Sequence, residues 1–187
     1  MKNILLLFLL YVSAAGSAQG VFSNQTNSTL EKVVKDYPSE FKNIRGELIS
    51  AGPGSAEYKS TLTIPGAVST TILQSALAQK QVVRWQSVVF SGNEFDAAKN
   101  RFEALFNQIK NTIIKPEGEK AVIVNGLYLS PSADKTVTTI QFDLMPPMGF
   151  MQNINIDLVL RNTGHKWNII LSVYDREMKE TADLTAN

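Results

Sequence analysis

The chain has 187 residues, of which 44% are hydrophobic and 19% are charged. This balance is typical of a globular protein and excludes a disordered or collagen-like chain. Its 18 basic and 17 acidic residues give a net charge of +1, which gives no reason to expect binding to nucleic acid. The chain has no Cys and a single His, so disulfides and thiol nucleophiles are excluded, and no metal site or cofactor is predicted.

The first 18 residues have the pattern of a cleaved secretory signal. Lys2 supplies a positive charge, residues 4–12 form an apolar run, and residues 16–18 are small enough for a cleavage site. The alternative is a membrane anchor, but this run is much shorter than the ~20 residues that a membrane span needs. The pattern therefore predicts an exported protein, in the periplasm or outside the cell, with no membrane span after the signal.

The remaining chain predicts one α+β domain at residues 28–175. Residues 19–27 are polar and predict a spacer, and residues 176–187 predict a polar tail. Removal of the signal leaves enough chain for one domain with a proper core. Because there is no Cys, packing alone must hold this domain together.

The first half predicts a helix followed by four strands. Ser28 and Glu31 have the spacing of a capping box, so the helix is expected to begin there, and Pro38 ends it. Four extended stretches follow, at residues 47–50, 57–64, 67–74 and 81–90. Pro65-Gly66 lies between two of them and predicts a tight turn.

A second helix is predicted at residues 93–112, where Ser91 and Glu94 repeat the capping-box spacing. Its apolar side chains form one stripe: Phe95, Ala98, Phe102, Leu105, Phe106, Ile109 and Ile113. Such a stripe would also suit a partner groove or a cofactor. Burial against a sheet is the commoner use in soluble proteins, and we expect it here.

The second half predicts a three-stranded antiparallel sheet with one apolar and one polar face. Apolar or small residues alternate with polar ones at residues 138–144, 154–161 and 167–173. Pairing of Phe142 with Ile156 keeps the apolar residues on one face. A tight turn at Thr163-Gly164 would place Leu160 opposite Trp167. The apolar face is expected to carry the second helix.

The two halves are alike in the order of their elements. This likeness predicts two helix-plus-four-strand units, at residues 28–90 and 91–175, related by an internal duplication. Short segments agree as well, since Phe41-Lys42-Asn43-Ile44 resembles Phe106-Asn107-Gln108-Ile109. The units would share one long antiparallel sheet, with the helices packed on one face, or stand side by side. The alternative is a chance likeness between amphipathic segments of the same type.

At the level of architecture, this arrangement resembles the tandem α-β repeats of secreted β-lactamase inhibitor proteins. The disulfides typical of that family are excluded in a chain without Cys. The segments at residues 85–90, 95–113 and 167–175 resemble uncharacterised exported proteins of Gram-negative bacteria. That resemblance covers most of the chain after the signal, and it implies a family rather than an activity.

Catalytic chemistry has little support in the sequence. His165 lies in the predicted turn of the last hairpin, where no nucleophile is held beside it, so we expect an exposed structural residue. Asp143 and Asp157 fall on the polar face of neighbouring strands, in diagonal positions about 7–8 Å apart. Glycoside hydrolases use two carboxylates at a similar distance, but no cleft or apolar pocket is predicted to change either pKa. No catalytic residue is therefore predicted.

The connection at residues 145–151 is the most unusual segment. It joins two predicted strands, yet it is almost wholly apolar and holds three of the five Met residues. Met-rich and apolar surfaces are typical of permissive binding sites. The candidate contact residues are Met145, Met148, Phe150 and Met151. The alternative, which we favour, is that the loop covers an open edge of the core.

The sequence thus predicts a non-enzymatic exported protein. It would bind another protein or a component of the cell envelope, through its sheet face or through residues 145–151. Two alternatives stay open. One is a periplasmic carrier that holds an apolar small ligand between the sheet and the Phe-rich helix. The other is a hydrolase that uses Asp143 and Asp157.

Overall fold

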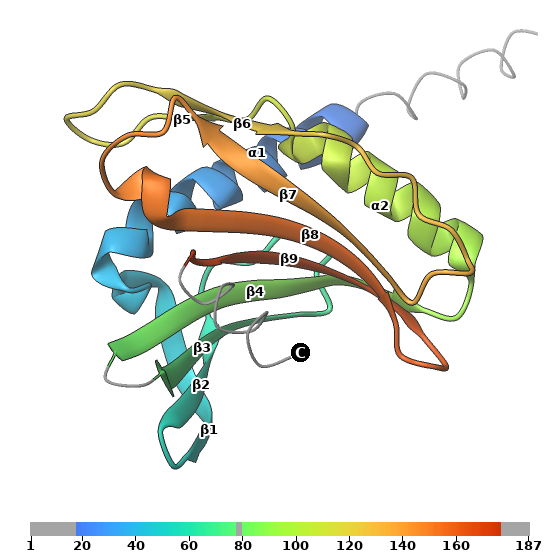
Figure 1. Cartoon of the computed structure of the whole chain (residues 1–187), viewed down its shortest axis with the longest axis horizontal. Coiled ribbons are helices and arrows are strands. Elements are labelled where there is room, and N and C mark those ends of the chain that lie inside the picture. Colours follow the sequence, from blue (N-terminus) through green and yellow to red (C-terminus); the bar gives the residue numbers. More distant parts are fainter. Residues whose placement is uncertain (1–17, 78–79, 177–187) are drawn as a thin grey trace, which may run out of the picture.

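The fold is α+β, and the computed structural model describes residues 18–77 and 80–176. Those residues form two α-helices and nine strands (Figure 1). The helices are α1 (Ala18–Asp36) and α2 (Phe95–Ile109), with short 3-10 turns η1 (Tyr37–Ser39), η2 (Lys42–Ile44) and η3 (Gly149–Asn153). The strands are β1 (Arg45–Gly52), β2 (Ser55–Ser60), β3 (Ser69–Leu77), β4 (Lys80–Gly92), β5 (Ile113–Ile114), β6 (Val122–Gly126), β7 (Val137–Met145), β8 (Ile154–Asn162) and β9 (Trp167–Asp175).

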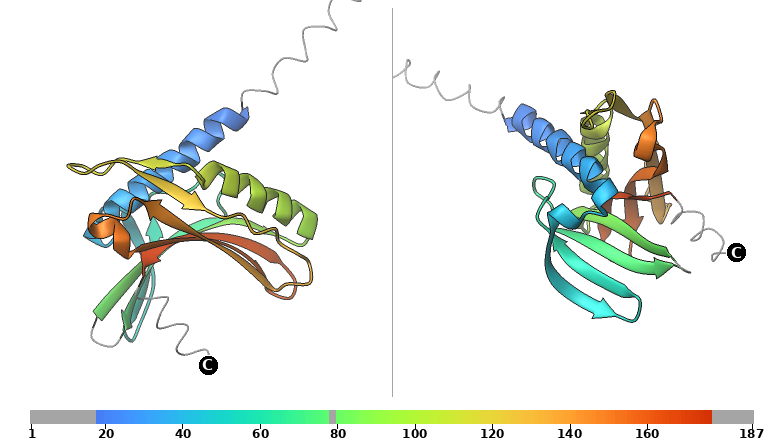
Figure 2. Two further views of the ribbon diagram at one scale, coloured as in Figure 1. Left: turned by 45° about the horizontal axis from the view of Figure 1, so that its top comes forward. Right: turned by 90° about the vertical axis from the view of Figure 1, so that its left-hand side faces the viewer.

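All nine strands belong to one antiparallel sheet, in the order β1-β2-β3-β4-β9-β8-β7-β6-β5. The last strands of the two halves, β4 and β9, therefore pair in the interior of the sheet. The sheet twists strongly, so that β1–β3 run at a steep angle to β7 and β8 (Figure 2). The second half has five strands rather than the expected four, because the two-residue strand β5 extends the edge. The internal duplication and the placement of both helices on one face stay predictions.

Helix α1 already includes Ala18, the first described residue, so the predicted start at Ser28 was wrong. Residues 19–27, predicted as a spacer, are part of this helix, and Thr26 is buried where its hydroxyl donates to Gln108 Oε1 of α2 at 3.1 Å. These polar residues include no Pro, and a tertiary contact of this kind overrides their weak helix propensity. Neither helix within the described residues is long and apolar enough to cross a membrane. Residues 1–17 of the predicted signal and residues 177–187 of the predicted tail lie outside the described residues.

Helix α2 is shorter than predicted at both ends. It begins at Phe95 with Glu94 as its N-cap, and no side chain caps it, because β4 continues through Ser91 and Gly92. The predicted capping box is therefore not formed. At the other end the helix stops at Ile109, and Ile113 lies in β5 with 53% of its surface exposed, so it is not part of the buried stripe.

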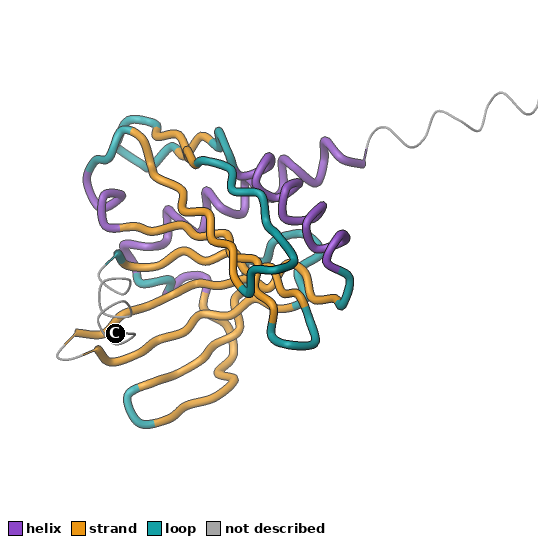
Figure 3. Tube along the Cα trace, turned by 45° about the vertical axis from the view of Figure 1, so that its right-hand side comes forward, coloured by secondary structure: helices purple, strands orange, loops and turns teal. Residues whose placement is uncertain are grey.

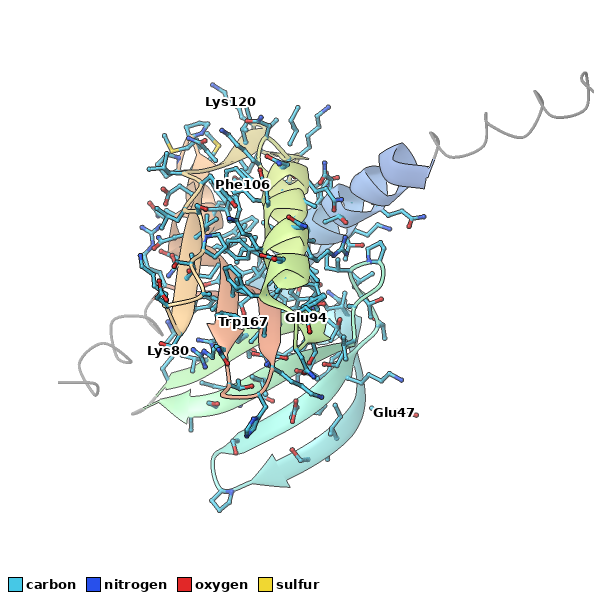
Figure 4. All side chains as sticks on the ribbon, turned by 90° about the vertical axis from the view of Figure 1, so that its right-hand side faces the viewer. Glu47, Lys80, Glu94, Phe106, Lys120 and Trp167 are labelled. Carbon is cyan, nitrogen blue, oxygen red and sulfur yellow. The ribbon has the colours of Figure 1, made fainter. Side chains whose placement is uncertain are left out.

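The hydrophobic core lies between α2 and the middle of the sheet. Helix α2 contacts β4, β8 and β9, and its buried residues are Ala98, Phe102, Leu105, Phe106 and Ile109. Aromatic rings meet across this interface, with Phe95 at 4.9 Å from Trp167 and Phe106 at 5.8 Å from Phe142 between ring centroids. Figure 4 labels Phe106 on α2 and Trp167 beside Glu94, where this helix begins. Leu30, Val33 and Val34 of α1 belong to the same core.

The register of the C-terminal strands is partly as predicted. Strand β7 pairs with β8 so that Phe142 lies opposite Ile156, which confirms the prediction. Between β8 and β9, Leu160 lies opposite Ile169 rather than Trp167, a difference of two residues. The connection at residues 163–166 is longer than a two-residue turn, and it is closed by a hydrogen bond from the Thr163 N–H to the Lys166 carbonyl at 2.9 Å. Figure 3 traces these antiparallel strands.

We expect Phe102→Ala to lower the free energy of unfolding by about 3–5 kcal/mol, because it removes a fully buried ring from the interface between α2 and the sheet. Asn107→Ala, on the exposed side of the same helix, is the matched control and should change it by less than about 0.5 kcal/mol. Urea unfolding of both variants measures the difference. Equal unfolding midpoints for the two variants would contradict the assigned core.

Candidate functional site

Polar side chains form a band across the sheet face that is turned away from α2. Successive residues of a strand point to opposite faces, so the neighbours of the core residues share this second face. The register places Gln86, Ser172, Asp157 and Gln141 in one row across β4, β9, β8 and β7. The adjacent row holds Arg84, Tyr174 and Asn155. These seven residues are called the polar band.

A short hydrogen bond lies at the centre of the polar band. The hydroxyl of Tyr174 donates to Asp157 Oδ2 at 2.6 Å, and the two residues are only 4% and 8% exposed. Burial raises the pKa of Tyr174 well above its ordinary value of 10.0, and the hydrogen bond to Asp157 and the negative charge of Asp157 raise it further. The positive charge of Arg84 and the side-chain amide of Asn155 oppose this rise only in part. The phenol therefore stays a neutral hydrogen-bond donor over the physiological pH range.

Two further contacts extend this pair over four strands. The guanidinium of Arg84 lies over the ring of Tyr174, with 4.6 Å between the guanidinium carbon and the ring centroid. On the other side, Gln141 Nε2 of β7 donates to Asn155 Oδ1 of β8 at 3.4 Å. The strands thus hold an aromatic ring, a cation, an anion and two amides on a rigid surface.

Three buried atoms of the polar band have no hydrogen-bond partner within the described residues. They are Asp157 Oδ1, Asn155 Nδ2 and Arg84 Nε. Asn155 itself is only 1% exposed. A buried polar atom without a partner costs ~1–3 kcal/mol. Three such atoms lie together in the polar band, which makes this face the candidate functional site.

The two candidate carboxylates lie on the same face in the predicted diagonal positions, since Gln141 lies opposite Asp157 and Asp143 is two residues further along β7. Their surroundings differ from the expectation of two exposed carboxylates. Asp143 has 60% of its side chain exposed and approaches Arg176 at 4.0 Å. Asp157 is buried because it packs against Tyr174. Each carboxylate therefore has its own partner.

Three of the four candidate contact residues in the apolar connection at residues 145–151 pack against the core. Met151 is 1% exposed, Met148 is half-buried, and the Phe150 ring stacks on Tyr37 with 6.3 Å between centroids. Met145 differs, because 48% of its surface is exposed. Of the four candidate contact residues, only Met145 presents a large apolar surface to solvent.

His165 is exposed in the loop between β8 and β9. Within residues 18–77 and 80–176, no three acidic or His side chains gather in a way that could hold a metal ion. Sequence reasoning included Asp157 but missed Arg84, Asn155 and Tyr174. The available signal was the register of β8 and β9, because the observed pairing places Asn155 opposite Tyr174, whereas the predicted pairing placed it opposite Ser172.

Comparisons of the chain with protein-family models, with curated proteins and with solved structures found no match. The resemblances drawn from the sequence therefore stay predictions, and the candidate site depends on its own geometry.

We expect the free energy of unfolding of the wild type to fall as the pH rises above about 10. The folded pKa of Tyr174 is above its ordinary value of 10.0, so the unfolded chain loses this proton at a lower pH than the folded chain. The stabilisation of the fold by the protonated Tyr174 hydroxyl is complete below pH 10.0 and is lost progressively above it. Tyr174→Phe should show a shallower fall in urea unfolding at pH 9–11. If the free energies of unfolding of the two proteins fell in parallel as the pH rises, folding would not raise the pKa of Tyr174.

A second comparison separates the two roles of the apolar loop. Phe150→Ser removes the ring that stacks on Tyr37 and should lower the free energy of unfolding by about 1–3 kcal/mol. Met145→Ser, at the exposed end of the same loop, should change it by less than about 0.5 kcal/mol. Thermal unfolding measures both. If Phe150→Ser kept the stability of the wild type, Phe150 would not be part of the core and would again be a candidate contact residue.

Proposed function

We propose that this chain is an exported, non-enzymatic binding protein that contacts another protein through its polar band. The observation that supports this function is the set of buried, unpartnered polar atoms around Tyr174 and Asp157, on the sheet face turned away from α2. Tyr and Arg are residue types enriched where protein interfaces have their strongest contacts. Strands hold such side chains more rigidly than loops do.

The geometry favours the sheet face over the apolar loop. The sequence offered both surfaces, but Met148, Phe150 and Met151 pack against the core. A partner that captured these three side chains would have to remove them from it. The polar band needs no such rearrangement of the core, since its residues point to the opposite face.

The two alternative functions have weaker support. A carrier would hold its ligand between α2 and the sheet, where the contacts of Phe95 with Trp167 and of Phe106 with Phe142 occupy the interface. A hydrolase would need two carboxylates that act together. Asp157 is bonded to Tyr174, whereas Asp143 is exposed beside Arg176.

Site-specific cross-linking in the producing cell tests the proposed function. A small diazirine-bearing residue replaces Gln86, a member of the polar band, in the full-length chain with its N-terminal segment. The matched control carries the same residue at Asn107, which is exposed on α2. We expect one discrete adduct with another protein from position 86 and none from position 107.

Arg84→Ala in the Gln86 cross-linking variant should abolish that adduct, because it removes the cation that lies over Tyr174. Thermal unfolding of each variant shows that the fold is kept. Adducts of equal yield from positions 86 and 107, or none from either, would count against the proposed function.

A further inference from the structure

This inference rests on the proposed function and concerns the chemistry of the partner. We propose that the polar band recognises uncharged amide groups of an extended peptide segment. The unpartnered atoms comprise two donors, Asn155 Nδ2 and Arg84 Nε, and one acceptor, Asp157 Oδ1. A peptide amide complements this set, because its carbonyl oxygen has two lone pairs and its N–H is a single donor.

The charges of the site favour a neutral ligand group. Asp157 supplies a carboxylate, and Arg84 supplies a guanidinium on the other side of Tyr174. A charged ligand group would be attracted by one of these residues and repelled by the other, so the pair partly cancels the attraction for either sign of charge. An amide is dipolar and uncharged, so it can bond to both residues without either repulsion.

The span of the site favours a segment over a single small group. Arg84 is on β4 and Asp157 is on β8, with β9 between them, so their backbones are two strand spacings, or about 10 Å, apart. Asn155 and Asp157 are two residues apart on one strand, or about 7 Å. An extended peptide repeats its amide groups about every 3.3 Å and so can reach several of these positions.

Arg84 is the side chain that a binding peptide would displace from Tyr174. Its guanidinium lies over the Tyr174 ring, and its Nε atom has no partner within the described residues. A cation–π contact of this kind contributes ~0.5–2 kcal/mol, so a binding peptide could displace it at modest cost. The displaced guanidinium would then be free to donate to a carbonyl of the peptide.

Binding of a capped diglycine, N-acetylglycylglycine amide, to the purified isotope-labelled protein tests this inference directly. Nuclear magnetic resonance should show saturable shifts of the Asn155 side-chain amide, with a dissociation constant on the order of 1–10 mM for so small a ligand. Asp157→Asn keeps an oxygen to accept from Tyr174 but removes the charge of the acceptor. It should weaken binding at least about tenfold.

The matched control is Asp143→Asn, which removes an exposed carboxylate from the same face and should change the affinity less than about twofold. Arg84→Lys keeps the positive charge without Nε and should weaken binding about fivefold, which provides a second readout if Asp157→Asn fails to fold. A methyl glucoside should cause no saturable shift. Equal shifts from the glucoside would assign the site to hydroxyl ligands and overturn the inference.

The absence of saturable shifts with the capped diglycine would also overturn the inference, because water would then be sufficient to satisfy the buried atoms. This result is distinct from failure of the proposed function. A cross-link from position 86 without diglycine binding would support a protein partner and reject the amide chemistry. Diglycine binding without a cross-link would support the amide site and count against the protein partner.

Discussion

The pairing of β4 with β9 is the constraint on which both the core and the candidate site depend. It joins the last strand of each half of the chain, with Trp85 opposite Val173 and Arg84 opposite Tyr174. Because neighbouring residues point to opposite faces, the first pair enters the core and the second enters the polar band. A shift of this pairing by one residue would exchange the two faces and destroy both.

The polar band lowers the stability of a domain that has no disulfide to compensate for it. The hydrogen bond between Tyr174 and Asp157 satisfies two of the buried groups. The atoms of Asn155, Asp157 and Arg84 that have no partner in the described part of the chain each carry a desolvation cost. A sheet face that served only to stabilise the fold would not require buried polar residues of this kind. Local violations of packing rules are expected at functional sites, which is why these residues outweigh the more conspicuous apolar loop as a candidate contact surface.

The C-terminal strands and the second helix could be predicted from the sequence because their patterns are local. Alternation fixed the face of each strand, and it also gave the pairing of Phe142 with Ile156. It could not fix the pairing of Leu160, because a shift of two residues keeps every side chain on its face. Alternation also could not identify Arg84 as part of the site. The β4–β9 pairing joins segments about 90 residues apart, and no local pattern specifies it.

The apolar loop at residues 145–151 has a structural role that explains its composition. It connects β7 to β8 and passes the C-terminal end of α1, where Phe150 stacks on Tyr37 and Tyr37 in turn meets Phe41 edge to face. Met151 of the same loop is buried in the core, with 1% of its surface exposed. These contacts anchor the end of the first helix to the strands of the second half. The loop thus joins the two halves at a second place, through the contact of Phe150 with Tyr37 and the burial of Met151.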